Sequence, residues 1–325
     1  CDPYTKADVP EHGWVGRLAM RHPGDFASGV LVFYRTRLEN GADHLSGLYF
    51  IVREAPCEET ARQILPALIE AFPDAPAGVL TELVAGTVRL LPLAQALSLV
   101  RAALATPGLS AEATARWTSA GFLLDSDAFG PALYAVLQPT GDKNADRMRL
   151  VTVISTLTGR DHPKDRGHSL TSSQCALLAE AIAGIRSVIP KRRRGAPDDD
   201  DDGDDDDGGY RHNAVEEFLE RCITVVAGDP SQDASDVLER LEGLDDLANK
   251  RQFVRHHRTR QLRARIDAEH RPPTPEEAMR LVQDVFPIGP ADLKIITANV
   301  VEDLAKRYRD GDASGYRKFW SLIEG

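Results

Sequence analysis

Cysteine is scarce in this chain of 325 residues, and its four copies share no spacing. Cys1, Cys57, Cys175 and Cys222 lie far apart, so the sequence has neither a C-x-x-C motif nor the spacing of a disulfide framework. Proteins without disulfides are typical of reducing compartments. We therefore expect a cytoplasmic protein.

Signature motifs of common enzymes are missing too. The phosphate-binding patterns G-x-x-x-x-G-K-[S/T] and G-x-G-x-x-G do not occur, and neither does the H-E-x-x-H or the G-x-S-x-G pattern. No alternation of strands and helices is indicated, which argues against a nucleotide-binding α/β domain. We expect a chain that is not an enzyme, with no cofactor, no metal and no catalytic residues.

Long apolar runs are also missing. The most apolar stretch, Leu90 to Val100, is flanked by Arg89 and Arg101. It is too short for a transmembrane helix, which needs about 20 apolar residues. We therefore expect no membrane partner.

The first residue is Cys1 rather than methionine. A lipid-modified cysteine would normally precede a flexible polar tether, but the apolar residues Val9, Trp14 and Val15 follow closely. We expect instead a piece of a longer protein, whose flanking domains would be among its partners.

Acidic charge, by contrast, is plentiful and concentrated. The formal net charge is −11, and subtracting the nine aspartates at 198–202 and 204–207 leaves only −2. The rest of the chain is therefore close to neutral, and its bulk charge neither favours nor excludes a nucleic-acid partner.

These aspartates belong to the segment 191–212, which opens with the basic tetrad 191–194. Such a segment repels itself and buries no apolar surface, so it predicts a disordered, flexible linker. An EF-hand register that starts at Asp198 puts Gly209 where a bidentate glutamate is required, which excludes a calcium loop of that type. A mimic of nucleic acid and a nuclear-type basic signal are the remaining alternatives.

Outside the linker, apolar residues recur with helical spacing between turns rich in proline, glycine and aspartate. Glu58–Phe72, Leu93–Ala105 and Ala111–Leu124 are three of the predicted helices, and Pro66 predicts a kink or a break in the first. Ser110 stands where an N-cap belongs. Elements of about 12–15 residues joined by tight turns are typical of an α-solenoid.

We therefore predict an all-α fold, an irregular helical-repeat array of the α-solenoid, HEAT-like type. Two blocks, residues 1–190 and 213–325, would be joined by the acidic linker 191–212. Capping boxes at Thr171–Gln174 and Thr274–Glu277 predict two further helix starts. A single irregular helical bundle is the alternative that the same periodicity allows.

Residues 1–55 allow two interpretations. Asn40-Gly41 is a good hairpin turn with strand formers on both sides, but Val30, Phe33 and Leu38 also have helical spacing. We favour two helices with Asn40-Gly41 as a C-cap, because the downstream sequence is helical.

A polar segment at 159–168 contains Asp161, His162, Asp165 and His168. Imidazole and carboxylate groups suit a metal site or acid–base catalysis. Polar residues are equally expected in a loop between helices, and we favour that plainer interpretation.

The most informative feature is a basic helix at 250–265, which has seven lysines and arginines and no acidic residue. The arginines that share one stripe, at about 100° per residue, are Arg251, Arg255, Arg258 and Arg265. This stripe is our candidate site for a partner or for phosphate groups, so nucleic acid is admitted as a partner. We favour a solvated face, or one paired with the aspartate run or with acids such as Asp245 and Asp246.

The histidines and tryptophans suggest structural roles. His256 and His257 are adjacent, so their side chains diverge, and we expect one to pack and the other to be exposed. Trp14, Trp117 and Trp320 fit core positions of helices better than a ligand platform.

The C-terminal sequence Arg-Asp-Gly-Asp-Ala-Ser-Gly-Tyr-Arg-Lys-Phe-Trp, at 309–320, follows a predicted long helix. It resembles a segment of large bacterial multidomain proteins that carry a NACHT/STAND-type NTPase module and a long helical-repeat region. The family's nucleotide-binding residues are not present in this chain. The resemblance implies that the chain is the repeat region alone, with a sensor or scaffold role in antiphage defence.

Together these observations predict a non-enzymatic helical-repeat scaffold or sensing segment of a larger cytoplasmic bacterial protein, which binds a protein or ligand partner. The alternative is a nucleic-acid-binding helical module that uses the basic helix 250–265. Binding that falls steeply with salt would distinguish the second from the first.

Overall fold

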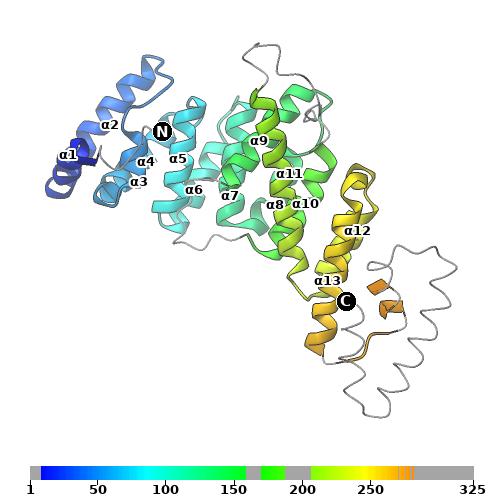
Figure 1. Cartoon of the computed structure of the whole chain (residues 1–325). Coiled ribbons are helices and arrows are strands. Elements are labelled where there is room, and N and C mark those ends of the chain that lie inside the picture. The colour runs from blue at the N-terminus through cyan, green and yellow to red at the C-terminus, as the bar shows by residue number, and fades with distance from the viewer. Residues whose placement is uncertain are drawn as a thin grey trace. The chain divides into compact units, whose positions relative to one another are not determined.

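The computed structural model of the chain describes residues 9–158, 170–186, 206–269, 271–274, 276–278 and 280–281. All regular secondary structure within these residues is helical (Figure 1). The all-α fold class that the sequence predicted is therefore confirmed. None of the helices in these ranges combines the length and the apolar character needed to cross a bilayer.

The chain divides into two compact units. The first comprises the described residues up to Leu170 and those from Ile185 to Phe218, and the second comprises Thr171–Gly184 and the described residues from Leu219 onward. This division differs from the predicted blocks because Thr171–Gly184 groups with the C-terminal residues. The difference has a physical basis in side-chain contacts such as that of Glu180 Oε1, which accepts a hydrogen bond from Arg240 Nε at 2.8 Å.

Helices α1 to α9 lie in the first unit, which also includes the helical residues 206–218. Their bounds are α1 Val9–Arg21, α2 Pro23–Glu39, α3 Leu48–Arg53, α4 Glu58–Ala71, α5 Ala77–Leu90, α6 Leu93–Leu104, α7 Ala111–Leu124, α8 Ser126–Val136 and α9 Lys143–Thr158. A short 3-10 turn, η2 (Ala55–Cys57), joins α3 to α4.

Helices one or two places apart in the chain make the main contacts of this unit. α2 packs against α4, α3 against α5, α5 against α7, and α7 against both α8 and α9. Such contacts are expected when each helix buries its apolar face against its neighbours. They agree with the predicted helical array, and the finer assignment to a HEAT-like solenoid stays a prediction.

The centre of the core of this unit lies around α7. Trp117 is fully buried there, and its Nε1–H donates to the carbonyl oxygen of Pro73 at 2.8 Å. Gly121 lets α8 approach closely, because a Cβ at this position would lie 2.3 Å from Cδ1 of Phe129. The predicted core position of Trp117 is confirmed.

Several helix starts lie where the sequence predicted them. Ser110 caps α7, and its Oγ accepts from the backbone N–H of Ala113 at 3.1 Å. Thr171 and Gln174 form a reciprocal capping box, with hydrogen bonds of 2.8 and 3.3 Å. The break considered at Pro66 is not found, because α4 runs through this residue with buried apolar side chains on both sides.

The helical interpretation of residues 1–55 is confirmed for α2 and α3. Asn40 is the C-cap of α2, and its Nδ2 donates to the carbonyl oxygen of Thr36 at 2.7 Å. Gly41 follows with φ of 77°, a left-handed conformation that favours glycine after a helix. α3 then begins after Gly47, so Asn40-Gly41 is not the turn of a hairpin.

The second unit is built from most of α10, the later part of α11, and the elements that follow them within the described residues. The bounds are α10 Ser172–Ile185, α11 Asp206–Ala227, α12 Gln232–Gly243, the 3-10 helix η5 Asp245–Lys250, and α13 Arg251–Glu269. α13 packs against α12, which places the basic helix beside an acidic neighbour.

α11 begins inside the segment that the sequence predicted as a linker. Residues 206–212 are helical in the structure. Farther along the same helix, Val215 and Leu219 are buried, and extending a helix from such a packed stretch costs less than starting a new one. The predicted linker is thus too long at this end, and residues 191–205 lie outside the described residues.

Candidate functional site

The first unit has an open apolar groove bounded by α1, α2 and the start of α3. Its volume is about 810 Å³, within the range of roughly 300–1,000 Å³ that ligand-binding pockets occupy. The apolar side chains that line it are Val15, Leu18, Phe26, Val30, Phe33, Phe50 and Ile51. The polar residues that line it are His22, Asp25, Tyr34 and Ser46, and two glycines, Gly29 and Gly47, complete the lining.

α2 contributes one apolar stripe to this groove. Phe26, Val30 and Phe33 lie three or four residues apart, so they share one face of the helix. Gly29 lies on the same face between the two phenylalanines, and a Cβ there would meet no atom within 4 Å. The stripe therefore has a hollow at its centre.

The apolar lining is partly open to solvent. Phe33 is 52% exposed and Leu18 is 40% exposed. Of the eight large hydrophobic side chains that are exposed among the described residues, five belong to α1, α2 and α3: Leu18, Met20, Val32, Phe33 and Tyr49. Of these five, Leu18 and Phe33 line the groove. Exposed apolar side chains gathered in a groove are typical of interaction sites.

A buried tyrosine fixes the shape of the groove. The Tyr34 hydroxyl donates to the carbonyl oxygen of Ser46 at 3.1 Å and thereby ties the loop before α3 to α2. Burial raises the pKa of Tyr34, so this hydroxyl stays protonated at ordinary pH. Its hydrogen is committed within the protein, and the groove offers few polar anchors to a small polar ligand.

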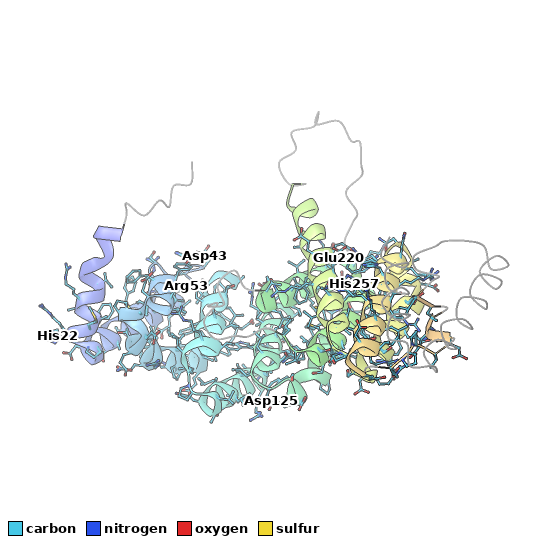
Figure 2. The ribbon with its side chains drawn as sticks, turned by 60° about the horizontal axis from the view of Figure 1, so that its bottom comes forward. His22, Asp43, Arg53, Asp125, Glu220 and His257 are labelled. Carbon is cyan, nitrogen blue, oxygen red and sulfur yellow. The ribbon has the colours of Figure 1, made fainter. Side chains whose placement is uncertain are left out.

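The charged end of the groove lies at the junction of α1 and α2. His22, which is labelled in Figure 2, immediately precedes α2, and Asp25 lies in the first turn of this helix. No ion pair within the described ranges involves Asp25, which is exposed. The groove thus combines an apolar stripe with one carboxylate at its end.

The second unit places the predicted arginines against acids. Arg255 Nε and Arg258 Nη1 each donate to the carboxylate of Glu242 at 2.9 Å. Arg258 Nη2 also lies 3.2 Å from Glu239 Oε2. Arg251 Nε donates to the backbone oxygen of Glu242 at 3.2 Å, while its Nη2 lies 3.7 Å from Asp245 Oδ1.

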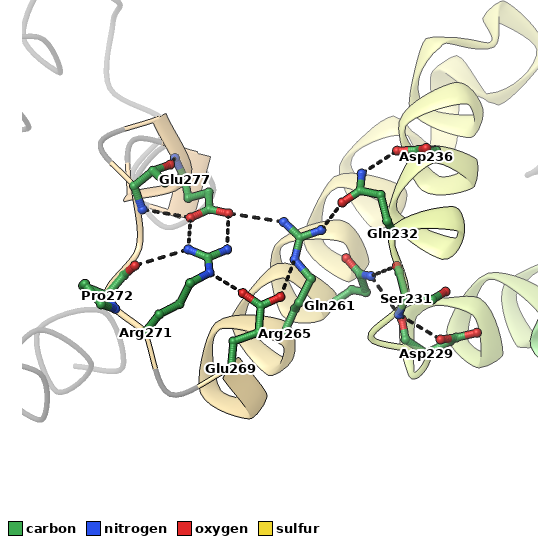
Figure 3. Close-up of polar contacts among 11 residues, drawn as sticks. Asp229, Ser231, Gln232, Asp236, Gln261, Arg265, Glu269, Arg271, Pro272 and Glu277 are labelled. Carbon is green, nitrogen blue, oxygen red and sulfur yellow. Dashed lines mark hydrogen bonds and ion pairs between the residues drawn. The ribbon is translucent and has the colours of Figure 1, made fainter.

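Arg265 belongs to a separate network at the end of α13 (Figure 3). Its Nη2 donates to Glu277 Oε1 at 3.2 Å, and Arg271 binds the same carboxylate through two hydrogen bonds of 2.7 Å. Glu277 also accepts from the backbone N–H of Thr274 at 2.8 Å, which confirms the predicted capping box. Hydrogen bonds from Arg271 are the main cause that lowers the pKa of Glu277 to about 2.

Glu242 is the central acid of the arginine stripe. Burial alone would raise its pKa, but the hydrogen bonds from Arg255 and Arg258 outweigh burial and lower the pKa below its ordinary value. The carboxylate is therefore ionised at neutral pH and neutralises part of the stripe. The four predicted site arginines lie on one helix as expected, and each has an acidic partner within the second unit.

One of the two adjacent histidines of α13 packs and the other is exposed, as predicted, but their rings do not diverge, because the two centroids lie 5.8 Å apart in an edge-on arrangement. His257 is 8% exposed, and its ring centroid lies 4.4 Å from that of Phe253, whereas His256 is exposed. Burial lowers the pKa of His257, and the positive charges of His256 and Arg260 add to this effect. The Nδ1 atom of His257 is buried without a hydrogen-bond partner.

Two cysteines that are far apart in the sequence meet in the second unit. Cys175 of α10 and Cys222 of α11 are each 1% exposed and share a hydrogen bond, which raises the pKa of the Cys222 thiol and lowers that of Cys175. Reagents cannot reach these thiols unless the helices open. Both cysteines are as buried as core residues, whereas reactive cysteine nucleophiles are at least partly exposed.

Several predicted features lie outside the described residues. These are the polar segment 159–168, the C-terminal segment 309–320, Trp320 and the side chain of Trp14. Within the described ranges, no group of three or more His, Cys, Asp or Glu side chains is arranged to hold a metal ion.

The predicted pairing of the stripe with Asp245 is found for Arg251, at 3.7 Å. Sequence reasoning missed the groove and the two glutamates that pair with Arg255 and Arg258. The spacing of Phe26, Gly29 and Phe33 was a usable signal for the groove. Glu239 and Glu242, three residues apart in the helix before the basic one, were the corresponding signal for the pairs. Comparison of the chain with protein-family models, with curated protein sequences and with solved structures gave no match.

Proposed function

We propose that this chain is a non-enzymatic helical scaffold or sensing segment of a larger cytoplasmic bacterial protein, and that it binds a protein partner through the groove of α1, α2 and α3. The resemblance of segment 309–320 adds antiphage defence as the setting. The groove is the observation that carries the proposal, because it is apolar, open and rich in aromatic side chains.

Aromatic residues, phenylalanine among them, are enriched in protein interfaces relative to the rest of the surface. Phe26, Phe33 and Phe50 all line the groove, and Phe33 is more than half exposed. Leaving such side chains in water costs roughly 25 cal/mol for each Å² of apolar surface, so a partner that covers them gains that free energy. A groove with one aromatic stripe and few polar anchors therefore favours a protein surface over a polar metabolite.

The arginine contacts argue against the nucleic-acid alternative. A phosphate backbone would have to displace Glu242 from Arg255 and Arg258 before it could bind these arginines. Binding to phosphates gains free energy mainly from released counterions, and that gain shrinks where protein carboxylates already neutralise the cations. We therefore rank protein binding first.

Photo-crosslinking tests the proposal in cells that express the whole natural protein. Benzoylphenylalanine is placed at Phe33, and the matched control places it at Tyr134, which is 46% exposed on α8 of the same unit. We expect a discrete adduct at position 33 that is absent at position 134. The captured protein is then purified and titrated calorimetrically against the chain and its Phe33→Ser variant, and binding should be at least tenfold weaker in the variant.

An equal adduct pattern at the two positions would contradict the proposal. So would unchanged affinity for Phe33→Ser. Fluorescence anisotropy with duplex DNA, duplex RNA and single strands at two salt concentrations tests the alternative separately. Salt-sensitive binding that is lost in the Arg251/Arg255/Arg258→Glu variant would promote the nucleic-acid function above the scaffold.

A further inference from the structure

The groove has a hollow that the fold itself does not require. Gly29 lies in the interior of α2, where glycine destabilises a helix by roughly 0.5–1 kcal/mol relative to alanine. At Gly121 and Gly86 a Cβ would collide with Phe129 and Leu65, so close packing explains those two glycines. A Cβ on Gly29 would meet nothing within 4 Å. Internal packing therefore does not explain Gly29. The same holds for the helical residues Gly24, Gly78, Gly184 and Gly243, but of these five glycines only Gly29 lines the groove.

A partner helix would account for this glycine. Large side chains of one helix fit into hollows between side chains of another, and small residues let the two backbones approach. Phe26 and Phe33 stand one turn to either side of Gly29 on the groove face, so the hollow is flanked by two aromatic rings. A bulky aliphatic side chain of an approaching helix fits this position.

The end of the groove specifies a charge for that partner. Asp25 lies four residues before Gly29, so the two share one face of α2. Both line the groove, and Asp25 makes no ion pair within the described part of the chain. A basic side chain one turn away from the aliphatic anchor would pair with this carboxylate at the rim, where ion pairs set specificity more than affinity.

We propose that the groove binds an amphipathic α-helix of a partner protein, with one bulky aliphatic side chain seated over Gly29 and a lysine or arginine beside Asp25. This depends on the proposed function, because it names the part of the partner that occupies the same groove. The interaction is of the helix-in-groove kind, in which apolar side chains one turn apart enter a hydrophobic groove.

A library of helix-forming peptides, displayed on phage and selected against the full chain, provides the probe. We expect the enriched peptides to share a large aliphatic residue and a basic residue three or four positions away. Gly29→Leu should weaken their binding at least tenfold, because leucine fills the hollow. The matched control is Gly24→Leu in the same helix, where a Cβ also meets nothing within 4 Å but the residue does not line the groove. This control should change binding less than twofold.

Exchanging the charges of Asp25 and of the peptide distinguishes a direct contact between them from an indirect effect of the variant on folding. Asp25→Lys should weaken binding of the selected peptide, and replacing the basic residue of the peptide by glutamate should restore binding to this variant alone. Thermal unfolding of Gly29→Leu should show a midpoint no lower than that of the unmodified chain, because leucine is a better helix former than glycine.

Three outcomes would overturn the inference. The first is enrichment of no helical peptide, or of peptides that bind Gly29→Leu equally well. The second is binding of a fatty-acid probe, dodecanoate, that Gly29→Leu abolishes while no peptide binds. The third is concentration-dependent self-association in light scattering that Gly29→Leu abolishes, which would make a second copy the occupant. If crosslinking at Phe33 captures a partner through a non-helical segment, the proposed function stands and only this inference fails.

Discussion

The groove of the first unit and the arginine stripe of the second differ in whether their side chains have partners within the described part of the chain. Arg255 and Arg258 have carboxylate partners at 2.9 Å in Glu242. Phe33 has no comparable cover and is 52% exposed. Arginines pair with acidic side chains of the same chain wherever these lie within reach. An exposed aromatic stripe, by contrast, is removed from water only when another surface covers it. The feature that stands out in the sequence is therefore not the feature that the fold leaves available.

The largest expected effect is on the free energy of unfolding, and it distinguishes two glycines of the first unit. Gly121→Ala should destabilise the protein by about 2–3 kcal/mol, because the new methyl group overpacks the contact with Phe129. Gly29→Ala should stabilise it by about 0.5–1 kcal/mol, since the methyl group meets open space in a helix interior. Urea unfolding followed by circular dichroism measures both. Changes of the same sign would contradict the view that, of these two glycines, Gly29 is open and Gly121 is closely packed.

The next effect concerns acid stability of the second unit. The pKa of Glu277 is about 2 in the folded protein, whereas an unfolded glutamate has a pKa of about 4.3. The unfolded chain therefore takes up the proton first, so this carboxylate stabilises the fold above about pH 4.3 and that contribution is lost as the pH falls toward 2. We expect a loss of about 2 kcal/mol, discounted for partial exposure of the carboxylate.

Urea unfolding between pH 5 and pH 2.5 tests this expectation. The difference in free energy of unfolding between the unmodified chain and Glu277→Gln should shrink as the pH falls. Glu276→Gln is the control, because the Glu276 side chain is exposed. A difference that stays constant over this range would show that Glu277 does not retain its charge at low pH.

The third effect would convert the arginine stripe into an available surface. Glu239→Gln combined with Glu242→Gln removes the carboxylates that hold Arg258, and the second change also removes the partner of Arg255. We expect a loss of about 1–2 kcal/mol in stability, mostly from Glu242, because Glu239 is the more exposed of the two. We also expect salt-sensitive DNA binding that the unmodified chain lacks. Fluorescence anisotropy at low salt measures it, and absence of binding in the double variant would show that the stripe has the wrong geometry for phosphates.

Helix ends could be predicted from the sequence because capping is local chemistry. Ser110, Thr171 and Thr274 each bond to backbone groups three residues away, so a few letters contain the whole interaction. The same holds for the turn at Asn40-Gly41, where a single left-handed residue ends the helix. The helical fold class followed from these ends and from apolar spacing.

The remaining features depend on contacts between distant parts of the chain. Glu180 and Arg240 are 60 residues apart, and this contact helps to place Thr171–Gly184 in the second unit. The pairing of Cys175 with Cys222 is equally invisible in their spacing. The groove required knowledge of which apolar faces are left uncovered, and that is decided only after every helix has packed. Periodicity identifies an apolar face but not its neighbour.

The smallest expected effect tests the buried histidine beside the arginine stripe. Burial, and then the charges of His256 and Arg260, lower the pKa of His257 below its ordinary value, so the folded protein holds this imidazole neutral while the unfolded chain protonates it near pH 6.5. The neutral state favours folding above about pH 6.5, and this contribution is lost as the pH falls toward the lowered pKa. His257→Phe removes this pH dependence and also removes the buried Nδ1 that has no hydrogen-bond partner.

We expect His257→Phe to stabilise the protein by about 0.5–1 kcal/mol at pH 5.5 and by less at pH 7.5. His256→Phe, at the exposed neighbour, should have a smaller effect. Urea unfolding at the two pH values measures both changes. If His257→Phe were equally stabilising at both, the effect would come from packing against Phe253 rather than from charge. A loss of stability at both pH values would instead mean that the imidazole makes a hydrogen bond that phenylalanine cannot supply. The second unit would then contain a buried polar group that contributes to stability through hydrogen bonding rather than through its charge state.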